Sequence, residues 1–132
     1  MPRQRIQSKI QVPPRARGFA PMGSYKHNNE HISMHIEEYE AIRLLDYENL
    51  TQSEAARIMG ISRPSLTRIY KRARGKIATL ITEARPMFIE GGNAFFDSEW
   101  ICCERCDSRF NTPRKNTHRA CPLCNSENIF HL

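Results

Sequence analysis

Four cysteines near the carboxyl terminus have the spacing of metal ligands. Cys103 and Cys106 form one Cys-x-x-Cys pair, Cys121 and Cys124 form a second, and fourteen residues separate the two pairs. Each pair can form a tight knuckle with both sulfurs on one side, and two facing knuckles create a tetrahedral four-sulfur site. The tail therefore predicts a structural Zn²⁺ site with these four residues as ligands.

Both the metal and its ligands have alternatives. A four-sulfur site also accommodates iron, alone or in an iron–sulfur cluster, although zinc is the commoner metal. Cys102 would pair with Cys106 across three residues, which suits a knuckle less well, so we expect Cys102 to be a spare thiol. His118 and His131 would become ligands only if they displaced a cysteine. The predicted site leaves no open coordination position, so its metal would be structural and not catalytic.

Charge is unevenly distributed along the 132 residues, whose formal net charge is +6. Residues 1–29 carry six basic side chains and no acid, residues 30–50 carry six acids and one arginine, and residues 51–85 carry eight bases and two acids. Two basic blocks thus flank an acidic one, so a polyanion would meet particular faces of the protein.

The sequence offers no membrane or export signal. No apolar run approaches the roughly 20 residues that span a bilayer, and no apolar stretch follows the first residues as in a signal peptide. We therefore expect a cytoplasmic protein without a membrane partner. In that compartment clustered cysteines more often bind metal than form disulfides.

The stretch from Gln52 to Lys71 predicts a helix, a tight turn and a second helix. Gly60 lies at the turn, where a helix end often needs a positive φ. Ser62 follows as an N-cap, and Pro64 falls in the first turn of the second helix, where its missing N–H has no helical partner. This combination is typical of a DNA-binding helix-turn-helix, with an ordinary αα-hairpin as the alternative.

The second of these helices, expected from Ser62 to about Glu83, has two contrasting faces. At about 100° per residue one side collects apolar residues and the other collects polar and basic ones. The apolar side consists of Leu66, Ile69, Ala73, Ile77 and Leu80. For base edges we expect Arg63, Ser65, Thr67 and Arg68, and for phosphates Lys71, Arg72 and Arg74.

A helix on which the next two helices pack is expected from Glu37 to Asn49. A shorter helix is expected from Ser53 to Met59. The first carries Glu37, Glu38 and Glu40, and we expect that acidic face to point away from DNA. Short strands are predicted near residues 31–36 and 87–90. We find no internal repeat.

Three segments divide the chain. Residues 1–29 are predicted to be a basic, loosely structured arm, although Ile6, Ile10 and Val12 leave room for a short packed strand. Residues 30–96 would form the helix-turn-helix domain, and residues 97–132 a zinc-ribbon-like domain. The last segment is too short to bury a stabilising core without metal.

Residues 37–92 resemble a family of small prokaryotic proteins of unknown function that are predicted to bind DNA and are related to region four of primary sigma factors. The resemblance rests on EAIRL with Asp46, on EAA-R-MG-SR, on R-I--AR-K-A and on IEGG. It implies a sigma-like domain whose recognition helix begins at Ser62 and enters the major groove, with Arg63 and Arg68 facing DNA. The tail varies among such proteins. The whole chain would then be mainly α: a three-helix sigma-like helix-turn-helix domain with short flanking strands, followed by a small four-cysteine zinc ribbon.

These observations favour a sequence-specific double-stranded DNA-binding protein that regulates transcription. A homodimer would place two recognition helices about 34 Å apart, and residues 77–92 are the expected interface because their apolar content exceeds what a three-helix core absorbs. Two alternatives are an adaptor whose ribbon docks on the transcription machinery and an RNA-binding protein. No enzyme is expected, because we find no paired carboxylates in a cleft, no phosphate-cradling glycine loop and no nucleophile with a base.

Overall fold

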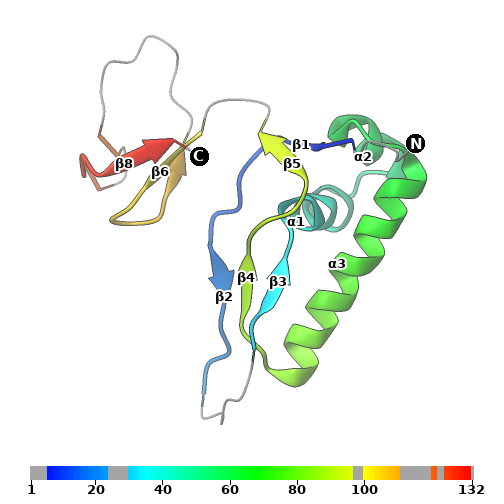
Figure 1. Ribbon diagram of the computed structural model, residues 1–132, viewed down its shortest axis with the longest axis horizontal. Helices are drawn as coiled ribbons and strands as arrows, with labels where there is room; N and C mark the ends of the chain where they lie inside the picture. Colours follow the sequence, from blue (N-terminus) through cyan, green and yellow to red (C-terminus); the bar gives the residue numbers. More distant parts are fainter. Residues whose placement is uncertain (1–5, 24–29, 97–99, 111–119, 122–123, 132) are drawn as a thin grey trace, which may run out of the picture.

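The computed structural model describes residues 6–23, 30–96, 100–110, 120–121 and 124–131 (Figure 1). The helical elements are α1 (Ile36–Ile42), its π-helical continuation η1 (Arg43–Tyr47), α2 (Gln52–Met59) and α3 (Arg63–Glu83). The strands are β1 (Ser8–Ile10), β2 (Gly18–Phe19), β3 (Ile32–Met34), β4 (Met87–Ile89), β5 (Ala94–Phe96), β6 (Ile101–Cys103), β7 (Arg109–Phe110) and β8 (Ile129–His131).

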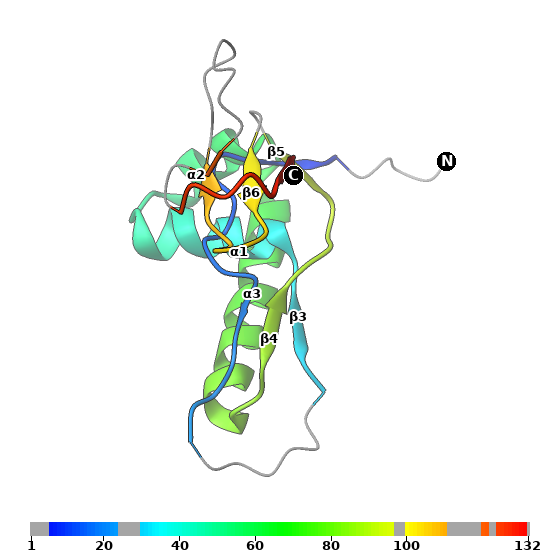
Figure 2. The ribbon, with the colours of Figure 1, turned by 90° about the vertical axis from the view of Figure 1, so that its left-hand side faces the viewer.

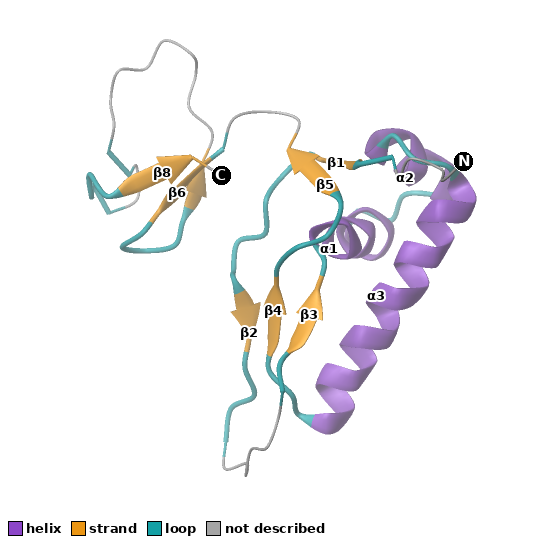
Figure 3. Cartoon of the chain, viewed as in Figure 1, coloured by secondary structure: helices purple, strands orange, loops and turns teal. Residues whose placement is uncertain are grey.

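The strands form three small sheets, so the prediction of a mainly α fold is wrong and the chain is an α/β mix (Figure 3). In the central sheet β4 lies between β2, which is antiparallel to it, and β3, which is parallel. Strand β1 pairs in parallel with β5, and β6 lies between β7 and β8 in an antiparallel sheet. Strands β3 and β4 lie in the two stretches that were predicted to be short strands, whereas the other strands, of two or three residues each, were not predicted. Most of the strands pair with partners far along the chain, although β6 and β7 are neighbours in the sequence.

Helix α2 is capped at its start, and the turn that joins it to α3 has Gly60 and Ser62 in the roles predicted for them. Thr51 accepts a hydrogen bond from the Glu54 N–H at 3.1 Å, and the Glu54 carboxylate accepts one from the Thr51 N–H at 3.2 Å, which completes a capping box. Gly60 ends α2 with a φ of 67°, a left-handed conformation that suits glycine. Ser62 caps α3 by accepting a hydrogen bond from the Ser65 N–H at 3.2 Å.

Helix α3 packs on two apolar clusters, one at each end of its length. The first joins α3 to α1, η1 and α2 and consists of Ala41, Leu44, Ala55, Ala56, Met59, Leu66 and Ile69. The second lies between α3 and the central sheet and is built around Ile32, Met34, Ala73 and Met87, with Ile77, Leu80 and Ile89 packed against it. Figure 2 shows α3 behind that sheet. The sheet thus covers part of the apolar surface of residues 77–92, while Ile81 and Phe88 stay exposed, and the dimer interface expected in this stretch stays a prediction.

The first segment of the chain is not a loose arm in the part that the structure describes. Residues 8–10 pair with β5, residues 18–19 pair with β4, and both Ile10 and Pro13 are fully buried. The prediction of loose structure is therefore wrong for these residues, and the packed strand that Ile10 left room for is present. Apolar Ile10 and the paired backbone of β1 supply the physical reason. The proposed domain boundaries stay a prediction.

None of the helices in the described part of the chain combines the length and the apolar composition that crossing a membrane requires.

Candidate metal centre and basic helix face

The first Cys-x-x-Cys pair closes a tight turn after β6. The Asp107 N–H donates to the Cys103 carbonyl at 2.9 Å, and the Cys103 N–H donates to the Ser108 carbonyl at 2.9 Å. Asp107 has a φ of 60°, a left-handed conformation that aspartate and asparagine tolerate better than most residues. These bonds hold Cys103 and Cys106 on one side of the turn.

The second pair repeats this turn. The Asn125 N–H donates to the Cys121 carbonyl at 2.8 Å, the Cys121 N–H donates to the Ser126 carbonyl at 2.8 Å, and Asn125 has a φ of 62°. The shared pattern is Cys-x-x-Cys, then Asp or Asn, then Ser, written in the sequence as CERCDS and CPLCNS. This short repeat was missed by the sequence analysis and corrects its finding of no internal repeat.

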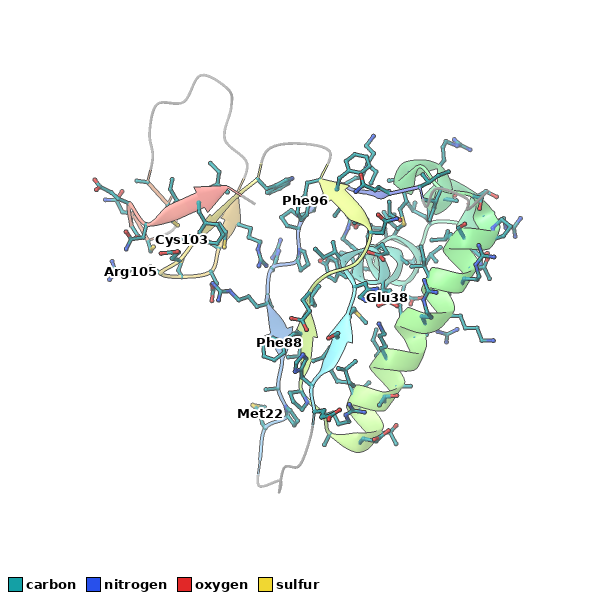
Figure 4. All side chains as sticks on the ribbon, viewed as in Figure 1. Met22, Glu38, Phe88, Phe96, Cys103 and Arg105 are labelled. Carbon is teal, nitrogen blue, oxygen red and sulfur yellow. The ribbon has the colours of Figure 1, made fainter. Side chains whose placement is uncertain are left out.

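The two turns bring the four predicted ligands together. The Sγ atoms of Cys103 and Cys124 lie 3.6 Å apart, and so do those of Cys106 and Cys121. All four sulfurs lie within 4.8 Å of one another. Sulfurs about 2.3 Å from a tetrahedral metal ion are separated by about 3.8 Å, so the cluster has the spacing of a metal site. Cys103, labelled in Figure 4, and Cys121 are buried, while Cys106 and Cys124 reach the surface.

Ser108 lies between two of the sulfurs, 3.0 Å from Cys106 Sγ and 3.1 Å from Cys121 Sγ. Its hydrogen bond to Cys106 holds the pKa of that thiol below the usual range. The Ser126 backbone N–H has the same effect on Cys124, but burial and the neighbouring sulfurs outweigh it and raise the pKa of Cys124 to about 11. Because a metal binds the thiolate, metal binding must displace this proton.

The competing ligands do not join the cluster in the described part of the chain. Cys102 is buried in β6, and the group of sulfurs within metal-binding distance does not include it. Its neighbour Cys103 points to the other face of the strand, as successive strand residues do. His118 and the side chain of His131 lie outside what the structure describes.

The predicted DNA-contacting residues lie along the first half of α3. Six of the seven are exposed, namely Arg63, Thr67, Arg68, Lys71, Arg72 and Arg74, whereas Ser65 is half-buried. The opposite side of the helix is buried at Leu66, Ile69 and Ala73, as the helical spacing of its apolar residues predicts. Thr67 Oγ1 lies 3.0 Å from Gln52 Oε1 at the start of α2 and 3.0 Å from the carbonyl oxygen of Arg63 in its own helix, and these two acceptors share its single hydroxyl proton.

The acidic residues of α1, whose face was expected to point away from DNA, are not exposed, and that expectation stays a prediction. Glu37, Glu38 and Glu40 are buried, with exposed fractions of 6%, 0% and 0%. Glu38, labelled in Figure 4, contacts two bases of α3: its Oε1 lies 2.6 Å from Lys76 Nζ and its Oε2 lies 3.6 Å from Arg72 Nε. A buried carboxylate needs such partners, and Arg72 is therefore already paired in the absence of DNA.

The sequence analysis did not predict that the carboxylate of Glu40 is buried as well. Glu40 Oε2 accepts the Gln11 N–H at 2.8 Å, and Glu40 Oε1 accepts the Arg43 Nε–H at 2.5 Å. Arg43 Nη2 also donates to Gln11 Oε1 at 2.9 Å. The sequence contains no signal for this network because Gln11 and Glu40 are brought together only by folding.

Comparison with known proteins identifies relatives across nearly the whole chain. The family model described as "Protein of unknown function DUF134" matches residues 1–97. A UPF0251 protein of Chloroherpeton thalassium is 40% identical over 129 residues, which cover 98% of this chain and 85% of that protein. A UPF0251 protein of Halothermothrix orenii is 37% identical over 131 residues, covering 96% and 97%. No solved structure matches the chain.

Proposed function

The chain belongs to the DUF134 family of proteins of unknown function, and we propose that this member is a sequence-specific double-stranded DNA-binding protein that regulates transcription. The observation that supports the proposal is the outer face of α3. Helix α3 would lie in the major groove, which is wide enough for an α-helix. Arg63, Ser65, Thr67 and Arg68 would contact base edges.

The charges on this face are available to a ligand. Among the described residues, Arg63, Arg68, Lys71 and Arg74 form no ion pair, although acids are abundant in α1. Arg68 has one polar partner, Ser65 Oγ at 3.3 Å, and the Arg74 guanidinium lies 5.4 Å from the centre of the Tyr70 ring. Unpaired bases on the exposed side of a helix are what a phosphate backbone neutralises.

The capped turn before α3 supports the same proposal. It connects α2 to α3 through Gly60 and Ser62, and Thr67 Oγ1 of α3 lies within hydrogen-bonding distance of Gln52 Oε1 at the start of α2. A short α2 packed against the longer recognition helix is the arrangement that presents such a helix to DNA.

For the tail we propose a zinc-ribbon-like module with one structural Zn²⁺. Four sulfur ligands, two matching knuckles and a three-stranded sheet support zinc, with iron as the less common alternative. Bound Zn²⁺ would supply folding free energy to a segment too short for its own core.

The proposal is tested by selection from a random pool of DNA duplexes at near-physiological salt with the Zn²⁺-loaded full chain. We expect wild-type protein to enrich a motif that an Arg63→Ala/Arg68→Ala variant does not enrich. An Arg105→Ala variant, changed at an exposed base of the tail, should enrich the same motif as wild type. A two-fold symmetric motif would indicate a homodimer. Weak, salt-sensitive binding without a motif would contradict the proposal and favour an adaptor or an RNA-binding protein.

The salt dependence of DNA binding should distinguish two neighbouring bases of α3. Lys71 is exposed and unpaired among the described residues, so its replacement by alanine should lower the slope of log K against log salt by about 0.9. Arg72 already lies beside Glu38, so Arg72→Ala should lower the slope by less. Titrations at several salt concentrations measure both slopes. Equal reductions of the two slopes would show that the contact with Glu38 does not prevent Arg72 from binding a phosphate.

A further inference from the structure

Residues 11–17, called here the strap, contact the metal-binding module directly. Arg17 Nη2 lies 2.8 Å from Asp107 Oδ1, and Arg109 Nη1 donates a hydrogen bond to the Pro14 carbonyl. Asp107 directly follows the metal-ligand candidate Cys106, and its N–H closes the first knuckle. Both contacts from the module therefore come from the knuckle or the strand just after it.

The same strap is bound to the body of the protein. Its first residue, Gln11, donates its N–H to the buried Glu40 carboxylate at 2.8 Å, and its last, Arg17, accepts the Ile89 N–H at 2.8 Å through its carbonyl oxygen. The strap thus touches α1 at one end and β4 at the other. Figure 1 shows the module and α3 on opposite sides of the central sheet, so these contacts join distant parts of the molecule.

Beyond the strap, the chain leads to the proposed DNA-binding face. Gln11 follows β1, and Ile6 and Ser8 line a cleft of about 500 Å³ together with Ser65 and Arg68 of α3. One continuous stretch, residues 6–17, therefore runs from the start of the recognition helix to the metal-binding module.

We propose that metal occupancy of the four-cysteine centre regulates DNA binding through the strap, an inference that rests on the proposed function. Metal orders the first knuckle and thereby places Asp107 and Arg109 against the strap. Without metal the module cannot stay folded on its own core, and both contacts are lost. The strap then opens more often from the body, and although the β1–β5 pairing keeps Ser8 in place, Ile6 is positioned less firmly beside α3.

Hydrogen exchange on the full chain, with Zn²⁺ and after chelation, tests the link. Removing Zn²⁺ should speed exchange of the Gln11 and Ile89 amides about tenfold, whereas the Leu66 amide, bonded to the Ser62 carbonyl inside α3, should not change. Affinity for the selected duplex should fall by about tenfold, a usual size for coupling between sites.

An Asp107→Asn/Arg109→Gln variant separates the strap from the metal. Asparagine fits the left-handed turn, because Asn125 occupies the equivalent position of the second knuckle, so this variant should still bind one Zn²⁺. With Zn²⁺ bound, its Gln11 and Ile89 amides should nevertheless exchange as in metal-free wild type. A matched Glu104→Gln/Arg105→Gln variant, which changes the same charges on exposed residues of the first knuckle, should behave as wild type.

Three results would overturn the inference: unchanged exchange of both strap-bonded amides on chelation, faster exchange of Leu66 to the same extent, or wild-type behaviour of the Zn²⁺-bound Asp107→Asn/Arg109→Gln variant. Specific DNA binding that does not depend on Zn²⁺ would also overturn it. If no state of the protein binds DNA specifically, the proposed function fails instead, and the exchange rates still decide whether metal controls the strap.

Discussion

Replacing Cys103 or Cys121 by serine should abolish metal binding and unfold the C-terminal module while the helices stay folded. Both residues are buried, and each contributes one corner of the four-sulfur cluster. Structural Zn²⁺ contributes on the order of 10–16 kcal/mol to the folding of small metal-binding units. No other term available to residues 100–132 is of that size, because so short a segment buries little apolar surface.

Metal content and hydrogen exchange measure this loss. Wild-type protein should hold one Zn²⁺ per chain, and the serine variants none at Zn²⁺ concentrations that saturate wild type. Amides of the two knuckles, such as those of Asp107 and Asn125, should lose their protection, while far-UV circular dichroism keeps the helical signal of α1 to α3.

Cys102 provides the matched control. It is buried beside Cys103 but lies outside the cluster, so Cys102→Ala should retain one Zn²⁺ per chain. Loss of metal in the Cys102 variant, or full metal content in the Cys103 and Cys121 variants, would show that the ligands are assigned incorrectly.

Replacing Arg68 by alanine should weaken binding to the selected duplex by about 1–3 kcal/mol, the discrimination that one bidentate contact to guanine provides. Arg68 is exposed on α3 and has no ionic partner among the described residues. Binding to an unrelated duplex should fall much less, because only the general electrostatic attraction of one charge is lost. Parallel titrations of both duplexes at one salt concentration measure the two losses.

An Arg68→Lys variant tests whether the side chain contacts a base or a phosphate. Lysine keeps the charge but lacks the planar fork of the guanidinium group, so it should rescue a phosphate contact and rescue base recognition poorly. Equal losses on both duplexes for Arg68→Ala, or complete rescue by lysine, would remove Arg68 from base recognition.

The metal-ligand candidates and the helices were predictable because their signals are local. A Cys-x-x-Cys pair carries its turn geometry within a few residues, and the structure closes both pairs with the same hydrogen bonds. Likewise, Thr51 with Glu54, Gly60 and Ser62 act through neighbours three or four positions away, so the bounds of α2 and α3 lie within a residue of those predicted.

The sheets were not predictable in the same way. Strands β2 and β3 both pair with β4, from which the whole of α1 to α3 separates them, and each has only two or three residues. Their pairing depends on which apolar surface of α3 is left after α1 and α2 have packed, a quantity that no local pattern contains. The mainly α prediction failed for this reason.

By itself, the sequence determined the four-cysteine spacing, the capped turn and the basic stripe of α3, because each depends on residues close together along the chain. Only the tertiary structure decided whether the acidic residues of α1 are exposed or buried. Glu38 and Glu40 are charged groups that the sequence places equally well in solvent, and they are buried because Arg72, Lys76, Arg43 and the Gln11 N–H converge on them. The cost of burying a charge is offset only by partners that folding brings within hydrogen-bonding distance.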